Sequence, residues 1–428
     1  MNFTGNHHKI DILQRKFQND FLIILESQMQ EHPSSKQSYV AVRLLNRIEA
    51  RGDRIDWWID GRRESFVMNP WQALSEFRKK TGNWLFGYLG YDLKNYIENL
   101  SSRNDSIIDL PDLFFMEPEF LFRIDGQEIH QIAGPEISLT GSNHQPEQKS
   151  GMNLQQFQPS VTKPDYVKNI EQIQEHIKNG DFYELNYSFP MCGKFSGNPY
   201  QLYREMRQIN PVPFGAYLSL NGFSAVCASP ERFLKKTGTK VISEPIKGTA
   251  ERVEDAKLDT RQKEELLNEK NRAENLMIVD LVRHDLSKIA KTGTVKVAKL
   301  FDVQTFGTVH QLISTIEAET ENQADPVEIL EDCFPMGSMT GAPKIEVMKT
   351  IDRLEQYRRG LYSGAIGYFT PDGDFDFNVV IRTAIIQGNK LIYPVGGAIT
   401  SDSSPEKEWR ETEIKARSIT RVFQKETA

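Results

Sequence analysis

Three ionisable side chains near the carboxyl-terminal end of the sequence share one face of an expected helix. Glu408, Glu411 and Lys415 are spaced three and four residues apart, which brings them together on one side of a helix. Two neighbouring carboxylates could hold a divalent cation, but the same spacing is common in solvated ion pairs on exposed helices. By itself, the pattern does not distinguish a site from a surface.

A further carboxylate, Glu274, lies at the start of a strongly apolar helical stretch that runs to residue 283. A buried acid needs a hydrogen-bonding partner or a metal. No cluster of histidine or cysteine residues lies near it in the sequence, and a site built only from carboxylates favours Mg²⁺ over Zn²⁺. We therefore predict that a metal bound here is a hard cation.

Residues 335–344 and 394–400 are two segments that are unusually rich in small residues. The first contains Ser338, and the second contains the pair Gly396 and Gly397 just before the expected helix. Paired glycines allow backbone amides to approach an anion closely, although either segment could equally be an ordinary tight turn. Neither matches the pattern of a phosphate-binding loop, so nucleotide binding is not indicated.

Two short segments in the middle of the chain contain a lysine and a glutamate of interest. Glu231 lies in residues 229–232, and Lys247 lies in residues 244–249. A lysine acts as a nucleophile only in its neutral form, which requires surroundings that lower its pKa. A lysine in such a strand-like setting is more often a surface charge, and the sequence does not show which applies here.

The composition is that of a large folded protein without a polyanionic partner. The chain has 428 residues, of which 39% are hydrophobic and 26% charged, and its net charge of −7 provides no attraction to nucleic acid or anionic membranes. The apolar run at residues 21–25 is too short to cross a bilayer. We therefore expect a cytoplasmic protein that binds neither nucleic acid nor membrane. The three cysteines have no paired spacing and predict no disulfide framework.

Hydrophobic spacing and turn residues predict the elements that must position these side chains. Helices are expected at residues 71–80, from Pro164 to Gly180, between 258 and 291 as one helix or two, and from Pro405 onward. Strands are expected at residues 39–42, 183–189, 214–227, 364–369, 377–386 and 390–395. Because helices and strands do not alternate strictly, we predict an α+β fold built on antiparallel sheets.

A polar segment divides the chain. Residues 134–163 are rich in Ser, Gln, Asn, Gly and Pro and have little apolar periodicity, which is typical of an exposed connection. We therefore predict an α+β subdomain at residues 1–140, a linker at 141–163 and a catalytic domain at 164–428.

In this order, these segments resemble the chorismate-utilising enzyme family, which includes the anthranilate, aminodeoxychorismate, isochorismate and salicylate synthases. The resemblance covers residues 164–423 and rests on six motifs: residues 180–181 with the strand that follows, 229–232, 245–249, and the segments around Glu274, Ser338 and Gly396–Gly397 with its following helix. It implies the fold of anthranilate synthase component I, in which two large, mostly antiparallel sheets pack together and are flanked by helices.

The resemblance also implies how the substrate would be held. Mg²⁺ would be bound by Glu274 and Glu411, with Glu408 nearby, and would hold the ring carboxylate of chorismate. The enolpyruvyl carboxylate would be held by Tyr362, Arg382 and the amides of Gly396 and Gly397. Ser338, His310 and Lys415 match further pocket positions, and a hydrogen-bonded core histidine is the competing interpretation of His310.

Two positions point to one branch of the family. Lys247 would attack C2 while Glu231 protonates the departing C4 hydroxyl, and anthranilate synthases usually have alanine in place of this lysine. Glu184 stands where the isochorismate and salicylate synthases have a water-activating lysine and where the amine-transferring branches usually have glutamine. The resemblance therefore implies amination of chorismate at C4 to give 4-amino-4-deoxychorismate for para-aminobenzoate and folate synthesis. An anthranilate synthase component I, or a non-catalytic subunit that binds chorismate or tryptophan, is the alternative.

The resemblance implies one protein partner and one further pocket. Since the sequence lacks a Gly-x-Cys-x-Gly glutaminase motif, ammonia is expected from a separate glutaminase subunit in a heterodimer, or from free ammonium. Near the amino terminus, Leu25, Glu26 and Ser27 resemble a segment that lines a tryptophan pocket in relatives, together with Pro211, Pro213 and Phe214. We favour a structural role for that pocket over a regulatory one.

Overall fold

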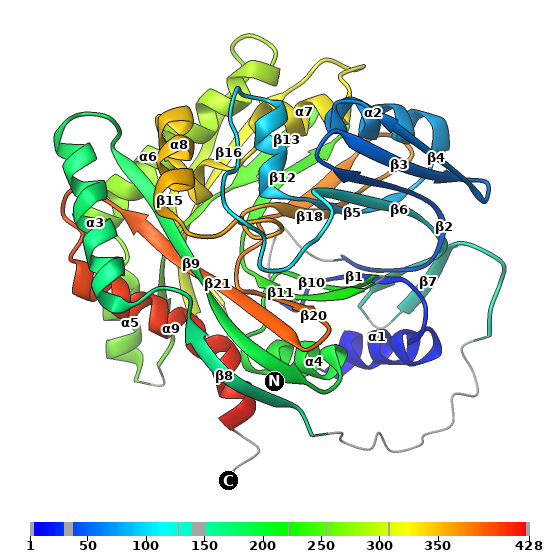
Figure 1. The fold of residues 1–428 in the computed structure, drawn as a ribbon, viewed down its shortest axis with the longest axis horizontal. Helices are drawn as coiled ribbons and strands as arrows, with labels where there is room; N and C mark the ends of the chain where they lie inside the picture. The colour runs from blue at the N-terminus through cyan, green and yellow to red at the C-terminus, as the bar shows by residue number, and fades with distance from the viewer. Residues whose placement is uncertain are drawn as a thin grey trace.

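The computed structural model describes residues 4–29, 37–126, 128–138, 151–220, 222–253, 255–306 and 309–424. All strand pairs among these residues are antiparallel, and helices cover the sheets, so the predicted α+β class is confirmed (Figure 1). Of the helices in these parts of the chain, none combines the length and the apolar character needed to cross a membrane.

The strands form two halves. The first half contains, in order of pairing, β8 (Asn153–Pro159), β9 (Glu184–Ser196), β21 (Lys390–Ile399), β20 (Thr383–Gln387), β11 (Phe223–Ser229), β10 (Phe214–Leu220) and β1 (Leu22–Glu26). The second half contains β6 (Leu113–Asp125), β5 (Leu85–Leu89), β18 (Ala365–Phe369), β19 (Phe375–Asn378), β12 (Arg232–Thr237), β13 (Lys240–Glu244) and β16 (Val309–Glu319), which also pairs with β14 (Ile246–Glu251) and β15 (Lys296–Thr305).

One long strand joins the two halves. β2 (Gln37–Arg51) pairs with β1 and also, along most of its length, with β6. Together with β3 (Arg54–Ile59), β4 (Arg62–Val67), β7 (Glu128–Ala133) and β17 (Gly341–Ala342), the described strands therefore form a single hydrogen-bonded network of 21 strands. The two sheets that the sequence led us to expect are thus two halves of one network.

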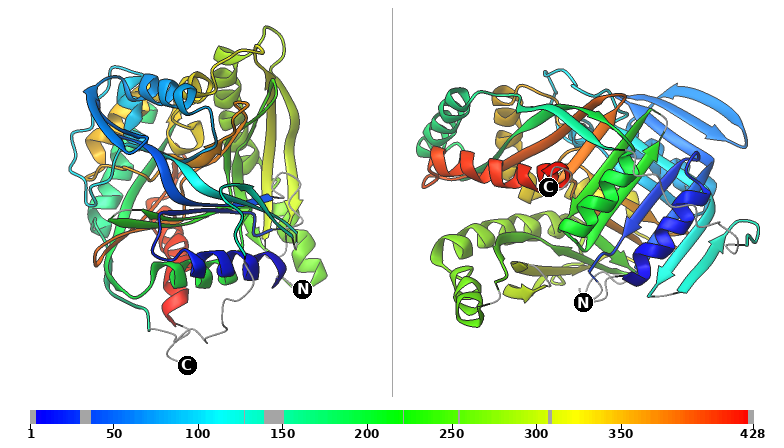
Figure 2. Two further views of the ribbon diagram at one scale, coloured as in Figure 1. Left: turned by 90° about the vertical axis from the view of Figure 1, so that its right-hand side faces the viewer. Right: turned by 90° about the horizontal axis from the view of Figure 1, so that it is seen from below.

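Three apolar clusters separate the layers. The cluster between the halves combines residues of β1, β10 and β20, such as Ile23, Leu218 and Ile385, with residues of β5 and β6, such as Phe86 and Phe114. On the outer face of the first half lie α1 (Thr4–Lys16), α3 (Lys163–Lys178), α4 (Pro199–Ile209), α8 (Lys344–Leu354) and α9 (Pro405–Gln424). On the outer face of the second half lie α2 (Pro70–Thr81), α6 (Glu269–Ile289) and α7 (Pro326–Cys333), so helices cover both outer faces (Figure 2).

Local signals in the sequence account for several element boundaries. Thr162 caps α3 by accepting a hydrogen bond from the backbone N–H of Asp165, and Gly180, with φ of 81°, follows the end of the helix. The expected helical stretch at 258–291 consists of two helices, α5 (Ala256–Glu265) and α6, because Asn268 caps a new helix start. The expected strand at 214–227 is a hairpin of β10 and β11.

The predicted linker takes part in the sheet. Residues 141–150 lie outside the described residues, but residues 153–159 form β8, which pairs with β9, and α3 begins at Lys163. In addition, β1 pairs with β10 and β5 pairs with β18, so residues 1–140 and 164–428 share the strand network. The composition of the segment indicated an exposed connection because the outward side chains of an edge strand are polar as well.

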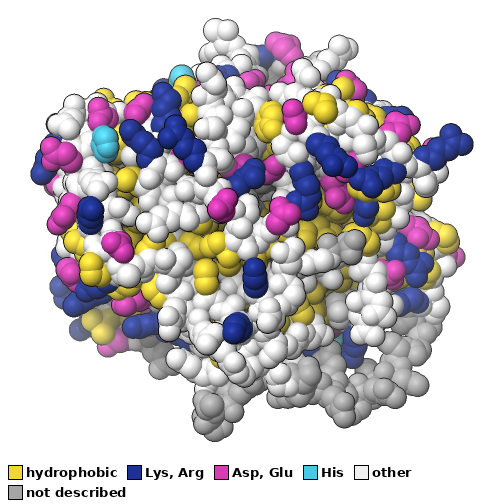
Figure 3. Space-filling view, in the orientation of Figure 1, with side chains coloured by type: hydrophobic (Ala, Val, Ile, Leu, Met, Phe, Trp, Pro, Cys, Tyr) yellow, Lys and Arg dark blue, Asp and Glu magenta, His cyan; other side chains and the backbone are white. Residues whose placement is uncertain are grey.

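The surface on the side shown in Figure 3 has acidic and basic side chains interspersed over its upper part, and apolar side chains exposed in a band across its middle. A surface of mixed sign is what a small net charge distributed over many Lys, Arg, Asp and Glu residues produces.

Candidate active site

A cavity of about 630 Å³ lies between the two halves and the helices α6 and α9. In the right-hand view of Figure 2, α9 (red) lies opposite the yellow-green helices α5 and α6. Eleven of the side chains and glycines that the sequence singled out line this cavity: Glu231, Lys247, Glu274, Ser338, Tyr362, Arg382, Gly396, Gly397, Glu408, Glu411 and Lys415. Residues separated by almost the whole catalytic segment therefore meet in one place.

The glycine pair on β21 has two different roles. A Cβ at Gly396 would lie 2.5 Å from the carbonyl oxygen of Tyr187 on the neighbouring strand β9, so only glycine fits there. A Cβ at Gly397 would instead point into the cavity, 3.5 Å from Glu408 Oε2, 3.8 Å from Lys415 Nζ and 3.9 Å from Glu411 Oε1. The absent side chain of Gly397 thus leaves open the space where the three ionisable groups of α9 converge.

Aromatic packing orients α9 over the sheet. Trp409 stacks on Phe189 of β9 with ring centroids 5.5 Å apart, and it meets the ring of Tyr166 from α3 edge-on. Because Trp409 faces the sheet, its neighbours Glu408 and Glu411 are directed toward the cavity. Lys415 Nζ donates a hydrogen bond to the carbonyl oxygen of Gly396 at 2.6 Å and lies 2.7 Å from Glu411 Oε1.

The three candidate metal ligands differ in their electrostatic surroundings. Burial and the neighbouring Glu411 raise the pKa of Glu408. Burial also raises the pKa of Glu274, and the carboxylates of Glu184 and Glu411 add to this effect. Burial opposes the charge of Glu411 as well, but the adjacent Lys415 outweighs it and lowers the pKa overall. Such mutual repulsion among carboxylates is relieved when a cation binds between them.

Glu274 is held by the buried face of α6. Ile278 and Val279 pack into the apolar cluster of the second half, and Asn275 accepts a hydrogen bond from the hydroxyl of Ser314 on β16 at 2.6 Å. Glu274 is left facing the cavity, with Lys270 Nζ one turn away at 3.7 Å. Within the described part of the chain, no three His, Cys, Asp or Glu side chains are gathered closely enough to enclose an ion.

Lys247 projects from an irregular part of β14. The pairing of β14 with β16 shifts register between Ile246 and Thr249, and Gly248 in this bulge has φ of 87°. A bulge turns a side chain away from the regular face of a strand. Lys247 Nζ donates a hydrogen bond to Glu184 Oε1 at 3.0 Å. Burial opposes the charge of Lys247, but Glu184, Glu274 and Glu231 together outweigh it and raise the pKa of the amine.

Glu231 is a buried carboxyl between β11 and β12. Its backbone N–H donates to Ser229 Oγ at 3.2 Å, and its carbonyl oxygen accepts a hydrogen bond from Val379 at 3.0 Å. Burial raises the pKa of Glu231 to about 7, and the Ser338 hydroxyl and the cations Lys247 and Arg382 only partly oppose this shift. A carboxyl with this pKa is protonated in part of the molecules near neutral pH and can act as a general acid.

Arg382 lies in the break between β19 and β20, where the sequence predicted one continuous strand. Its backbone has φ of 51°, a conformation that non-glycine residues rarely adopt, and such strain is often found at functional sites. Burial lowers the pKa of its guanidinium, and no hydrogen bond or ion pair connects that group to another described residue. Tyr362 lines the same cavity. An unpaired guanidinium facing a cavity is suited to bind an anion in a bidentate manner.

His310 is not among the residues that line the cavity. It is 1% exposed, its Nε2 lies 3.1 Å from Asp259 Oδ1, and its Nδ1 lies 2.9 Å from Thr305 Oγ1. The interpretation as a hydrogen-bonded core histidine therefore describes its position. Conversely, Asn186, Lys270, Asn271 and Tyr393 line the cavity although the sequence did not single them out. Asn186 lies within the strand of a recognised motif, the one that follows residues 180–181, and Tyr393 directly precedes the small-residue segment of β21.

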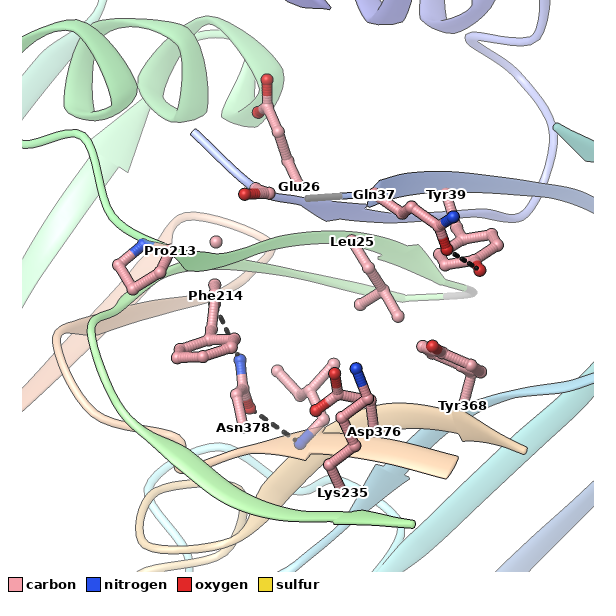
Figure 4. A pocket seen from close by; sticks show the side chains of 13 residues that line it. Leu25, Glu26, Gln37, Tyr39, Pro213, Phe214, Lys235, Tyr368, Asp376 and Asn378 are labelled. Carbon is pink, nitrogen blue, oxygen red and sulfur yellow. Dashed lines mark hydrogen bonds between the residues drawn. The ribbon is translucent and has the colours of Figure 1, made fainter. Parts of the chain in front are cut away.

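A second cavity, of about 300 Å³, is lined by five of the six residues predicted for a tryptophan pocket. Leu25, Glu26, Ser27, Pro213 and Phe214 line it, while Pro211 is not among the described residues that do. In Figure 4 the Glu26 carboxylate points away from this cavity. It is buried against α4, where Arg207 and Tyr203 bind it, and although burial opposes its charge, these partners and His7 lower its pKa.

Comparison with known proteins places this geometry in a family. Residues 23–421 match the family described as chorismate binding enzyme. The chain is 35% identical over 352 residues to aminodeoxychorismate synthase component 1 of Escherichia coli K12, covering 79% of this chain and 76% of that relative. It is 34% identical over 355 residues to anthranilate synthase component 1 of Thermus thermophilus, covering 79% of this chain and 77% of that relative.

Solved structures show the same fold. Anthranilate synthase component I from Streptococcus pneumoniae TIGR4 superimposes with a TM-score of 0.78 at 26% identity, covering 91% of this chain and 93% of that one. The menaquinone-specific isochorismate synthase MenF of E. coli shares the fold, with a TM-score of 0.73 at 18% identity, covering 94% of this chain and 88% of that one. With the family match spanning nearly the whole sequence, the chain belongs to the chorismate binding enzymes.

Proposed function

We propose that this chain aminates chorismate at C4 with ammonia, giving 4-amino-4-deoxychorismate for para-aminobenzoate and folate synthesis. The observation that carries the proposal is the presence in one cavity of an amine, Lys247, and of a carboxyl with a pKa of about 7, Glu231. Several relatives named aminodeoxychorismate synthase, including component 1 from E. coli and from Bacillus subtilis, support it at 35% and 32% identity.

The residues divide the reaction into two displacements. Lys247 attacks C2 of the ring, both ring double bonds shift toward C4, and the C4 hydroxyl leaves as water with the proton of Glu231. Ammonia then attacks C4, both ring double bonds shift back, and the amine of Lys247 leaves C2. The enolpyruvyl group is retained, and Arg382 and Tyr362, with the amides of β21, hold its carboxylate.

The carboxylates that line the cavity fit Mg²⁺. Mg²⁺ in proteins usually keeps several waters and binds one or two carboxylates together with anionic groups of the substrate, so it does not need a preformed cage. Glu274 and Glu411, with Glu408 beside them, offer hard oxygen ligands around the space left open by Gly397. When bound there, Mg²⁺ would supply positive charge for the ring carboxylate of chorismate.

We also propose that ammonia reaches the site from a glutaminase subunit. The designation "component 1" of the relatives implies a second component, and the sequence has no Gly-x-Cys-x-Gly motif of its own. A buried path for ammonia between the two subunits would protect the ammonia from protonation in bulk water.

The competing function is that of an anthranilate synthase, which the T. thermophilus relative represents at 34% identity. Product analysis distinguishes the two. The purified chain is incubated with chorismate, Mg²⁺ and an ammonium salt, and a lyase that removes pyruvate from 4-amino-4-deoxychorismate is then added. We expect para-aminobenzoate by mass spectrometry. Fluorescent anthranilate as the sole product, or no amine-containing product, would contradict the proposal.

A further inference from the structure

Glu184 and Lys247 form an enclosed ion pair beside the cavity. Their side chains are 2% and 13% exposed, and Lys247 Nζ donates to Glu184 Oε1 at 3.0 Å. The other carboxylate oxygen, Oε2, is buried and accepts no hydrogen bond from the described residues. Leaving a buried carboxylate oxygen without a donor costs free energy, so stability alone does not account for an acid at this position.

The backbone fixes Glu184 at this distance. The short strand β17 pairs with the start of β9, with Ala342 opposite Glu184, and Ala342 accepts a hydrogen bond from the N–H of Tyr183 at 2.8 Å. Gly341, with φ of 144°, approaches so closely that a Cβ on it would lie 2.0 Å from the carbonyl oxygen of Glu184. The strand that presents the carboxylate is therefore anchored by a contact that only glycine permits.

The proposed reaction requires Lys247 to be neutral, but its surroundings keep it charged. Burial disfavours the ammonium, whereas Glu184, Glu274 and Glu231 together raise the pKa of the amine above its ordinary value. A base within hydrogen-bond distance must therefore remove a proton before attack. Among the described residues, Glu184 is the only acceptor that Lys247 Nζ contacts.

We propose that Glu184 is the base that converts Lys247 into a nucleophile by taking its proton. This inference rests on the proposed function, in which Lys247 attacks C2. One N–H bond of Nζ breaks, an O–H bond forms on Glu184, and the electron pair stays on nitrogen for the attack. The proton returns to Nζ when ammonia displaces the amine of Lys247. Glu231 is therefore needed only to protonate the C4 hydroxyl. A glutamine at this position would accept a hydrogen bond but not the proton.

The test measures the attack of Lys247 on C2 in the absence of ammonia, because the protonation of ammonia also changes with pH. Wild type and Glu184→Gln are mixed with chorismate and Mg²⁺, and the mass increase on Lys247 is followed by intact-protein mass spectrometry between about pH 6 and pH 9. In the wild type the proton moves from Lys247 to Glu184 within the ion pair. We therefore expect the rate of adduct formation to change little with pH until Glu231 loses its proton. In Glu184→Gln, we expect a rate about 10²-fold lower near neutral pH. That rate should rise, relative to wild type, by about tenfold per pH unit, because lysine must first release its proton to water.

The ratio of the adduct-formation rates of Glu184→Gln and wild type isolates the effect of position 184. Glu231, Glu274 and Glu411 also face Lys247, from the β11–β12 connection, α6 and α9, and they are the same in both proteins. Glu184→Asp, which keeps a base on a shorter side chain, should slow the step but keep the pH dependence of the wild type. Lys247→Arg is the control for the site of modification and should give no mass increase.

A role limited to charge predicts the opposite result. Without the carboxylate the pKa of Lys247 falls, so Glu184→Gln would form the adduct as fast as wild type or faster at neutral pH, and the proposal would be overturned. If the wild type aminates C4 but forms no adduct, the role of Lys247 itself fails and the proposal fails with it. If the adduct forms normally in both proteins, only the inference about Glu184 fails.

Discussion

At the scale of single residues, the site gives its carboxyl group, Glu231, and its amine, Lys247, different environments. Burial raises the pKa of Glu231 to about 7, although Lys247 and Arg382 lie near enough to oppose the shift. Lys247 is surrounded by carboxylates that raise its pKa instead. At neutral pH, a proton donor and a protonated amine therefore share one cavity, and the amine needs a proton acceptor before it can react.

The pKa of Glu231 predicts how activity depends on pH. A general acid must carry its proton, and because its pKa is raised, Glu231 keeps that proton up to about pH 7 and loses it above. With the concentration of unprotonated ammonia held constant, kcat/KM should therefore fall as pH rises through about 7. Glu231→Gln should lower kcat by about 10²–10⁴-fold and abolish this decline.

A second glutamate provides a matched control. Burial likewise raises the pKa of Glu331, on α7, to about 7, but this residue is not among those that line the cavity. Glu331→Gln should leave both kcat and the alkaline decline unchanged. Should Glu231→Gln retain full activity with the same decline, another group must donate the proton.

At the scale of elements, strands and helices reach the cavity because buried polar side chains hold their ends together. Arg359, after α8, donates to the carbonyl oxygens of Met339 and Asn186, each at 2.7 Å, and is paired with Glu355. Glu355 in turn accepts a hydrogen bond from the N–H of Ser188 on β9 at 2.9 Å. This buried network fixes the Ser338 segment against β9, although neither charged residue lines the cavity.

The sequence predicted local features better than such long-range contacts. Capping residues and apolar spacing identified α2, α3 and α9, and the shared face of Glu408, Glu411 and Lys415 does point into the cavity. The break before Arg382 and the use of Arg359 could not be predicted, because each depends on backbone groups distant in the sequence. His310 illustrates the same limit, since its partner Asp259 lies 51 residues away.

Neighbouring glycines on β21 provide a test of how this element serves the site. Gly397→Ala adds a methyl group with contacts of 3.5–3.9 Å, so the fold should tolerate it and the melting temperature should change by no more than about 2 °C. The methyl group occupies the space between the groups of α9, so KM for chorismate should rise by about tenfold. Steady-state kinetics and thermal denaturation measure the two effects separately.

Gly396→Ala should give the opposite result. Its methyl group would meet the backbone of β9 at 2.5 Å, and such overpacking lowers the free energy of unfolding by about 1–3 kcal/mol. If Gly397→Ala were the more destabilising variant, or if it left KM unchanged, the space beside Gly397 would not belong to the substrate and metal site.

At the scale of the whole molecule, the cavity depends on both halves of the strand network. β9 and β21 of the first half contribute Asn186 and the glycine pair, while β14 of the second half contributes Lys247. The halves are held together by an apolar cluster to which the amino-terminal segment contributes Ile23, Phe86 and Phe114. The amino-terminal residues therefore stabilise the site without supplying any of the candidate chemistry.

This arrangement predicts that residues 1–140 and 164–428 unfold together. Chains of this length often unfold in steps, but here separation would break the β1–β10 and β5–β18 pairings and expose the shared cluster to water. Of the five tryptophans, Trp57, Trp58, Trp71 and Trp84 lie in the first segment and Trp409 in the second. Fluorescence of a Trp409→Phe variant therefore reports on the first segment alone.

In urea, that fluorescence should change at the same midpoint as the far-ultraviolet circular dichroism of the whole chain and the loss of activity. Trp409→Phe keeps an aromatic ring against Phe189, so its dichroism midpoint should lie close to that of wild type, which is the control for the substitution. A fluorescence midpoint well below the dichroism midpoint would mean that the first segment unfolds on its own. In that case the shared cluster would contribute little to the stability of the catalytic segment, and the amino-terminal part would be an independent domain.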